Sequence, residues 1–259
     1  MALEPFALTR VESARIAREL SRDVAGRLSV HVAGPDDDAA LLSLQVTGEV
    51  FLQSFGNTSE QLHREYAGLL PALTHVVAVD RVAQAPVGAL ILQQGRADGL
   101  KTVVDVAGPP WSVPPAETLA ALNLAPDDRT AADLLVMAVD GAFRNRGIAQ
   151  LLMYAGWVAS VARGIDRWTA ILDDGLLGGL HQLTAGAVAP IGSARSAPYL
   201  GSPGSTPITV RMDPAVDGDL LSRMQRVGRL VERTTAFCPR PEPDRVAFRA
   251  LREPSVAVA

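Results

Sequence analysis

The sequence has few of the residues on which several kinds of site depend. It contains one cysteine, Cys238, so it can form neither an internal disulfide framework nor a multi-cysteine zinc site. No glycine-rich dinucleotide motif, phosphate-binding P-loop, Gly-x-Ser-x-Gly elbow or His-Glu-x-x-His motif occurs. The four histidines are scattered along the chain: His31, His63, His75 and His181. A preformed metal site is therefore not expected.

Long apolar runs and a strong charge of either sign are also missing. No window approaches the length of a membrane span, and the first ten residues contain no apolar signal core, so we expect a cytoplasmic protein that does not bind membranes. The formal net charge is −4, which gives no overall preference for nucleic acid. The 259 residues, 48% of them hydrophobic, are enough to bury a core without disulfides or metal.

Residues 133–163 begin as an apolar run of strand length, turn through a short basic segment and continue as a helix-forming stretch. The first amides of a helix have no intrahelical partner and carry the positive end of the helix dipole. Gly147 and Ala149 leave the approach to these amides free of large side chains. Arg144 and Arg146 add formal positive charge. The stretch therefore predicts a site for a phosphate or pyrophosphate group.

The spacing Arg144-x-x-Gly147-x-Ala149 resembles the acyl-CoA pyrophosphate loop of the GNAT family, the Gcn5-related N-acetyltransferases. The family pattern is Gln/Arg-x-x-Gly-x-Gly/Ala after a central strand. The resemblance implies acyl-CoA, or phosphopantetheine on an acyl carrier protein, as donor cosubstrate, with no tightly bound cofactor. It assigns donor binding to Val136, Ala138, Val139, Arg144, Asn145, Arg146, Gly147, Ile148 and Ala149. The alternative is a basic turn between buried elements that binds no ligand.

The order of the other expected elements is the one this family requires. Helices are predicted over residues 9–26, 39–55, 59–70, 147–163 and 174–185, and strands over residues 28–33, 74–80, 86–93, 134–139 and 167–172. The expected fold is α/β, with a mixed twisted central sheet flanked by helices and an extra helix at each end. We expect a helical extension at 1–26, a GNAT-like domain at 27–212, and a helix with an extended tail at 213–259.

An insertion of nearly forty residues, at about 95–132, departs from a minimal domain of this family. A further strand is predicted over residues 101–106 and a short helix over residues 116–122. Between them Trp111 stands in a proline-rich segment and offers a large apolar face. Two interpretations are open: Trp111 forms a rigid wall of the substrate pocket, or it pins the insertion to the core.

Three side chains are candidates for acid–base chemistry. In many GNAT enzymes a Tyr acts as general acid toward the CoA thiolate. It lies seven residues after an Asn that opens the helix following the second central strand. Counting seven residues from Asp174 gives His181, and histidine is a residue type that can donate a proton to a thiolate or take one from an amine. Glu49 and Asp173 are the other candidates, at the end of the first domain helix and at a strand end. His181 can instead be a structural residue, and many members of the family use an ordered water as base.

The last part of the chain contains a loop and a basic helix. Residues 198–207 are rich in glycine, serine and proline and turn a hairpin between short strands at 190–193 and 208–212, with Tyr199 as a possible pocket residue. Residues 219–234 form a helix on which four arginines share a broad face. This face is either solvated surface or a binding site for an acidic carrier protein or a tRNA acceptor stem.

The predicted function is transfer of an acyl group from a thioester to an amine of a small molecule. The resemblance favours a specialised enzyme of the N-acyl amino acid or acyl-homoserine lactone synthase kind. One alternative is a transferase of natural-product biosynthesis that uses an aminoacyl-tRNA donor. Another is a non-catalytic acyl-CoA binding module. The acyl group, the amine and the oligomeric state are not specified by the sequence.

Overall fold

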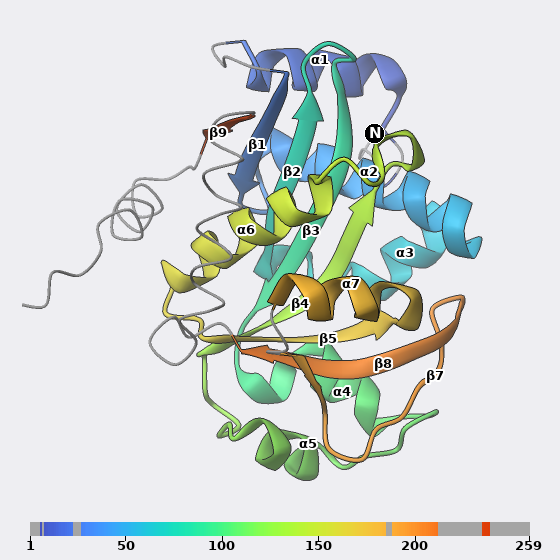
Figure 1. Ribbon diagram of the computed structural model, residues 1–259, viewed down its shortest axis with the longest axis vertical. Helices are drawn as coiled ribbons and strands as arrows, with labels where there is room; N and C mark the ends of the chain where they lie inside the picture. The colour runs from blue at the N-terminus through green and yellow to red at the C-terminus, as the bar shows by residue number, and fades with distance from the viewer. Residues whose placement is uncertain (1–5, 7, 23–26, 185–187, 212–234, 239–259) are drawn as a thin grey trace, which may run out of the picture.

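The fold is one mixed sheet with helices on both faces (Figure 1). A computed structural model describes residues 6, 8–22, 27–184, 188–211 and 235–238. The predicted helix at 219–234 and the tail from Pro239 lie outside these residues. The strands are β1 Leu28–Ala33, β2 Leu73–Asp80, β3 Ala85–Gln94, β4 Ala131–Val139, β5 Arg167–Asp173, β6 Val188–Pro190, β7 Ala197–Tyr199, β8 Ser202–Arg211 and β9 Thr235–Cys238. The α-helices are α1 Arg10–Leu20, α2 Asp38–Phe55, α3 Ser59–Tyr66, α4 Lys101–Ala107, α5 Pro115–Leu122, α6 Ile148–Val161 and α7 Asp174–Thr184.

The strand order is β6-β8-β5-β4-β3-β2-β1-β9, and β7 pairs with β8 outside this path. Neighbouring strands are antiparallel except for the pairs β4–β5 and β1–β9, which are parallel. The parallel pair β4–β5 is joined through α6, which makes a β-α-β unit at the centre of the sheet. The mixed sheet that was predicted is therefore confirmed.

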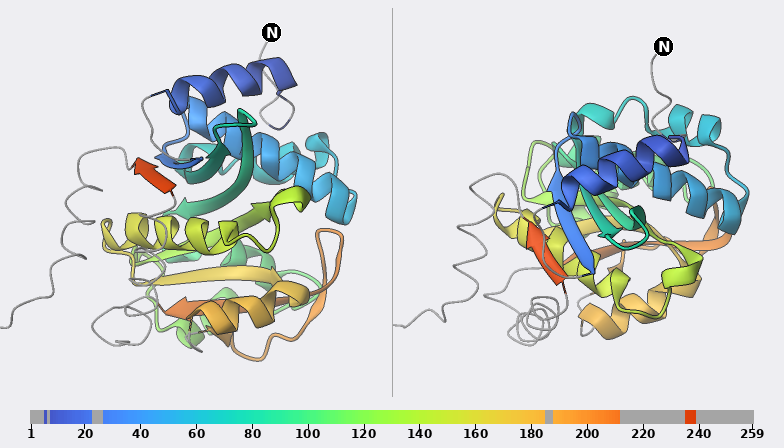
Figure 2. Two further views of the ribbon diagram at one scale, coloured as in Figure 1. Left: turned by 45° about the horizontal axis from the view of Figure 1, so that its top comes forward. Right: turned by 90° about the horizontal axis from the view of Figure 1, so that it is seen from above.

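The two faces of the sheet carry different helices (Figure 2). On β2, Val76 and Ala78 face α6, whereas Val77 and Val79 face α1 and α2. Every residue of β2 is buried because both of its faces are covered. The α3 helix lies on the same face of the sheet as α2, and its residues Leu62 and Tyr66 pack in the core on that face.

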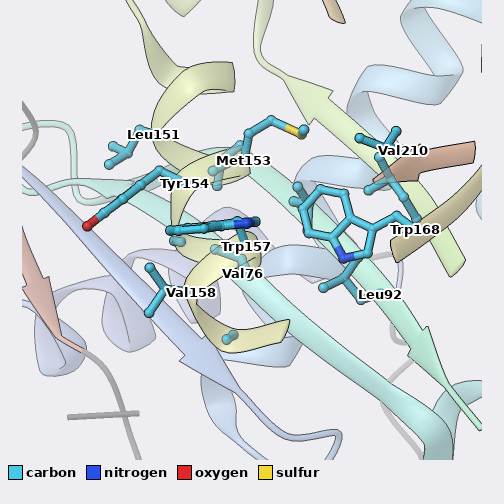
Figure 3. Packing of buried hydrophobic residues seen from close by; sticks show 14 of the residues in the cluster. Val76, Leu92, Leu151, Met153, Tyr154, Trp157, Val158, Trp168 and Val210 are labelled. Atoms are coloured by element: carbon cyan, nitrogen blue, oxygen red, sulfur yellow. The ribbon is translucent and has the colours of Figure 1, made fainter. Parts of the chain in front are cut away.

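The α6 helix is buried on nearly all sides, as its sequence predicts. Trp157 of α6 and Trp168 of β5 lie in this core with Val76, Leu92 and Val210 (Figure 3). The Trp168 Nε1 donates to Ser160 Oγ at 2.9 Å, which satisfies the one polar atom of a fully buried ring. Gly156 permits the close approach of helix and sheet, since a Cβ there would lie 2.9 Å from Leu90 Cδ2.

Three of the predicted elements need correction. Residues 101–106, predicted as a strand, form the helix α4 instead. The predicted strand 190–193 is found earlier in the chain, as β6, and the predicted helix 59–70 ends at Tyr66. The two strands of the predicted hairpin do pair, as β6 with the end of β8, but the segment 198–207 between them is not a simple loop: β7 and the start of β8 form a second, tighter hairpin with its turn at residues 200–201.

Candidate active site

The two central parallel strands separate after a short paired segment. Strands β4 and β5 pair from Ala131↔Arg167 to Asp133↔Thr169, and beyond this point β5 continues to pair with β8. The β4 edge at residues 134–139 therefore has no partner strand on this side in the described part of the chain. We call the space between residues 134–139 and 170–173 the wedge. The backbone groups of residues 134–138 on this side have no strand partner in the described part of the chain, so they can bind an extended ligand.

A bulge shapes the β4 side of the wedge. The register with β3 shifts between Leu92↔Leu134 and Ile91↔Val136, so Leu135 is the extra residue. Leu134 packs in the core with α6, whereas Val136 packs with α2 and α3. The bulge thus changes which face successive side chains occupy at the point where the wedge opens.

The wide end of the wedge leads into residues 140–147, which we call the basic loop. Asp140 fixes its start, because its backbone N–H donates to Val87 O and its carboxylate accepts from the Ala142 N–H at 2.7 Å. Gly147 has φ 82° and α6 begins directly after it. Since φ is positive at Gly147, any side chain there strains the loop. The first amides of α6 therefore open onto an exposed loop.

The two arginines of the basic loop lie at this mouth. Arg144 donates from Nε to Val139 O at 3.3 Å and from Nη2 to Ser54 Oγ at 3.2 Å. Arg146 lies over the Phe143 ring, 5.5 Å from its centroid. Both side chains are exposed, so both charges are open to an anion from solvent.

The residues predicted to bind the donor are brought together along one path. Val136 and Ala138 are buried with their side chains in the α2 core, so they can offer only backbone groups to a ligand. Ile148 is buried under α6 and can likewise offer only its amide. The path predicted for the donor, which we call the donor path, therefore consists of the β4 edge, the basic loop and the first turn of α6, and its role in binding stays a prediction.

A carboxyl group lies where the strands part. Asp133 is 0% exposed and accepts hydrogen bonds from the Thr102 N–H, from Thr102 Oγ1 at 2.7 Å and from Thr169 Oγ1 at 3.1 Å. Burial raises the Asp133 pKa to about 6 even though the bonds from Thr102 and Thr169 favour the charged form. Thr102 is in the first turn of α4, so Asp133 holds the start of this helix against the sheet.

Beside Asp133 is a small cavity of about 20 Å³, lined by Tyr66, Lys101, Thr102, Asp105, Asp133, Leu134, Leu135, Ile171 and Tyr199. The Lys101 ammonium contacts the carboxylates of Glu65 and Asp105. It also lies 5.9 Å from the ring centroid of Tyr66 and 5.8 Å from that of Tyr199. Burial alone would lower the Lys101 pKa, but the bonds to Asp105 and Glu65 raise it, so the amine stays protonated.

The sequence motifs do not point to this group, which we call the Lys101 cluster: Glu65, Tyr66, Lys101, Asp105 and Tyr199. Its best signal is the spacing of Lys101, the only lysine, and Asp105. Four residues apart on a helix, they contact each other directly at 2.6 Å, whereas on the predicted strand they would be far apart. The error in assigning residues 101–106 therefore also hid the cluster.

The two predicted pocket residues are brought together. The rings of Trp111 and Tyr199 lie 5.5 Å apart between centroids, and Tyr199 lines the cavity. The Trp111 Nε1 donates to Arg195 O at 2.7 Å, and the Tyr199 hydroxyl donates to Asp105. Trp111 thus both backs a cavity residue and ties the insertion to the segment before β7.

These two roles of Trp111 can be separated. We expect Trp111→Phe to keep the acceptor preference, because the ring still backs Tyr199, and to lose about 1 kcal/mol of unfolding free energy with the bond to Arg195. Trp111→Ala is expected to broaden the preference as well. The measurements are urea unfolding and kcat/KM for a small and a bulky amine. A Trp111→Ala variant with unchanged preference would show that Trp111 only pins the insertion.

The three predicted acid–base residues do not line the cavity. His181 is exposed on α7, and Glu49 is exposed on α2, where it accepts from Gln45 Nε2 at 2.9 Å. Asp173 accepts from the Gly175 N–H and from Ser202 Oγ, so it fixes the end of β5 to β8. The catalytic roles given to these residues remain predictions.

The described residues also limit the other kinds of site. Among them, no three His, Cys, Asp or Glu side chains are grouped so that they could hold a metal ion. Within the same residues, no helix has both the length and the apolar character needed to cross a bilayer.

Known structures share this arrangement. A CoA-dependent acyl-homoserine lactone synthase, BjaI, solved with SAM and isopentyl-CoA, is 16% identical, with a TM-score of 0.54 over 86% of this chain and 99% of that one. FeeM, an N-acyl amino acid synthase from uncultured soil microbes, is 12% identical, with a TM-score of 0.51 over 79% of this chain and 99% of that one. No protein-family model and no curated protein matches the sequence. The chain has the GNAT fold.

The basic loop lies where the resemblance predicts it, since residues 140–147 follow β4 directly. Its role in binding a pyrophosphate stays a prediction. The Lys101 cluster, by contrast, depends on α4, which belongs to the insertion between β3 and β4. The donor path therefore consists of elements that belong to the GNAT fold. The insertion instead contributes α4 to the cavity at the narrow end of the wedge.

Proposed function

We propose that this protein is an N-acyltransferase that moves an acyl group from a CoA or phosphopantetheine thioester to the amine of a small molecule. The observation that carries the proposal is the wedge, whose free β4 edge runs from a polar cavity to a basic helix start. A phosphorylated carrier fits the basic loop, and an extended arm fits the strand edge.

The dimensions of the wedge suit such a donor. Residues 134–139 span about 20 Å at roughly 3.3 Å per residue, which allows the two amides of a pantetheine arm to bond to the strand. With its pyrophosphate on the basic loop, the arm carries its thioester toward Leu134 and Leu135. These residues line the cavity beside Asp133, so an amine in the cavity meets the thioester carbonyl.

The reaction needs little from the protein beyond placement and proton transfer. The amine nitrogen attacks the thioester carbonyl carbon, the C–S bond breaks, and an amide and a thiolate form. The nitrogen loses one proton and the thiolate takes up one, by way of His181 or water. The Lys101 cluster favours this function over an acyl-CoA binding module, because a module that only binds the donor has no need of a polar cavity at the narrow end.

Release of thiol from acyl-CoA tests the proposal. We expect release that requires both the protein and an added amine, that forms one amide per thiol, and that ribonuclease does not change. Mass spectrometry of the amide and a thiol-reactive dye measure the two products. Activity that ribonuclease abolishes would support the aminoacyl-tRNA alternative, and binding of acyl-CoA without release under any condition would support the binding module. The rate of a His181→Ala variant in this assay tests the predicted proton donor.

A further inference from the structure

A groove on the surface leads toward the Lys101 cluster. It has a volume of about 310 Å³ and is lined by Asn57, Gln61, Leu62, Arg64, Glu65 and Leu200. It therefore lies between α3 and the turn that joins β7 to β8. Its volume is within the range of small-molecule sites.

Glu65 connects the groove to the cavity. It lines the groove, and its carboxylate contacts the Lys101 ammonium, which lines the cavity. Glu65 thus belongs both to the groove and to the Lys101 cluster. The Asn57 Oδ1 atom, in a residue that lines the groove, is buried and has no hydrogen-bond partner among the described residues. An unpaired buried acceptor is costly unless a ligand donor completes it.

We propose that the groove and the cavity together bind the acceptor, and that the acceptor is a terminal primary amine on an unbranched methylene chain rather than the α-amino group of an amino acid. The amine enters the cavity and the rest of the molecule lies in the groove. This inference rests on the proposed acyl transfer, because it names the acceptor of that reaction.

The size of the cavity is the first argument. About 20 Å³ is room for one water-sized group. An ammonium group on a methylene fits such a space, and the next methylene can follow it. An α-amino nitrogen is attached to a carbon that also carries a carboxylate and a side chain. Neither of these can enter behind the nitrogen without moving Tyr66 or Tyr199, whose rings form the walls.

Charge is the second argument. Two carboxylates, those of Glu65 and Asp105, contact one ammonium, that of Lys101, and a third carboxyl group, that of Asp133, lines the same cavity. A carboxylate in excess over the ammonium attracts a cation and repels an acceptor carboxylate. Asp105 and Glu65 also add to burial in raising the pKa of Tyr199.

The chain itself shows that the cluster accommodates an alkylammonium group. The Lys101 side chain is 11% exposed, and its ammonium lies between two carboxylates and near two tyrosine rings. These are the contacts by which proteins recognise organic ammonium ions. Arg64 is exposed on the groove side, so a carboxylate is tolerated only at the far end of the acceptor.

The acceptor must lose a proton before it attacks. Glu65 is suited to take this proton, because its side chain is 33% exposed, lines the open groove and contacts the ammonium of Lys101, which lines the cavity. The proton passes from the ammonium to the Glu65 carboxylate and then to solvent. The neutral amine then attacks the thioester, and the charges of the cluster return to their starting state.

The test uses acceptors that carry the same amine with and without an α-carboxylate. The pairs are cadaverine and lysine, agmatine and arginine, and tyramine and tyrosine, each with acyl-CoA and the full-length protein. We expect kcat/KM to be at least tenfold higher for agmatine than for arginine and for tyramine than for tyrosine, because in these pairs the carboxylate is next to the only reactive amine. Lysine also carries both kinds of amine, and we expect its product to be acylated at the ε-nitrogen, as read by tandem mass spectrometry.

Variants locate the preference in the cluster. Glu65→Gln and Asp105→Asn are expected to reduce these two ratios at least threefold, whereas Glu60→Gln, an exposed change on the same helix as Glu65, should leave them unchanged. Equal or reversed ratios in the wild-type protein, or α-acylated lysine, would overturn the inference while leaving acyl transfer intact. Absence of thiol release with all six acceptors would instead count against the proposed function.

Discussion

A double variant with Arg144→Gln and Arg146→Gln is expected to lose about 100-fold in kcat/KM for acyl-CoA. Each arginine is exposed on the basic loop at the start of α6, where a pyrophosphate would lie. A hydrogen bond to a charged group contributes about 1.5–3 kcal/mol, and the loss of two such bonds corresponds to at least this factor. We expect the loss mainly in KM for the donor, because the pyrophosphate is bound equally in the ground state and the transition state.

Two controls make this result specific. Acyl-pantetheine has the same thioester arm without the nucleotide, so its kcat/KM should be nearly the same for the variant and the wild type. Arg129→Gln removes an exposed arginine near the opposite end of β4 and should leave acyl-CoA kinetics unchanged. If the double variant binds acyl-CoA with wild-type affinity, or loses activity equally with both donors, the basic loop is not the pyrophosphate site.

The donor side of the site could be predicted from sequence because it is local. Strand β4, the basic loop and α6 follow one another in the chain, and their apolar pattern and Gly147 are visible without tertiary contacts. The order of the flanking strands then limits the sheet to few topologies. The residue at which β4 and β5 stop pairing could not be predicted from the sequence, because the pairing ends next to the bulge at Leu135 and no local pattern marks that bulge.

The acceptor side could not be predicted because its parts come from distant segments. Glu65 and Tyr66 belong to α3, Lys101 and Asp105 to α4, and Tyr199 to β7. The segment 101–106 contains three β-branched residues before Asp105, which favours a strand. Asp133, more than thirty residues away in the chain, accepts from the Thr102 N–H and stabilises a helix start instead. A tertiary contact therefore favours the helix α4 over a strand, and α4 places Lys101 and Asp105 next to each other in the Lys101 cluster.

This dependence makes Asp133 the most sensitive position of the acceptor side. An Asp133→Ala variant is expected to lose about 4 kcal/mol of unfolding free energy, because it leaves the Thr102 N–H and the Thr102 hydroxyl without their acceptor, at roughly 1–3 kcal/mol each. It also leaves Thr169 Oγ1 with only its longer bond to Ala132 O at 3.5 Å. Acyl transfer should fall with it, since α4 carries Lys101 and Asp105. Urea unfolding measures the first effect. A Glu117→Ala change on α5, at an exposed position, should cost little.

The buried carboxyl also predicts how stability depends on pH. The Asp133 pKa is about 6 in the folded protein, against 3.8 as its ordinary value, so the folded protein binds this proton more tightly than the unfolded chain does. The stabilisation from this proton is complete below pH 3.8 and is lost as the pH rises through 6. Over this interval it amounts to roughly 3 kcal/mol, at about 1.4 kcal/mol for each tenfold change in proton affinity.

An Asp133→Asn variant isolates this contribution, because the amide has nearly the same shape and cannot titrate in this range. The unfolding free energy of the wild type, minus that of the variant, is expected to fall by roughly 2.4 kcal/mol between pH 4 and pH 7. Other titrating groups contribute equally to both proteins and cancel in the difference. A difference that stays constant with pH, or that rises, would mean that Asp133 is ionised as readily as an exposed carboxyl. In that case its charge, rather than a shared proton, would hold α4 in place beside the cavity.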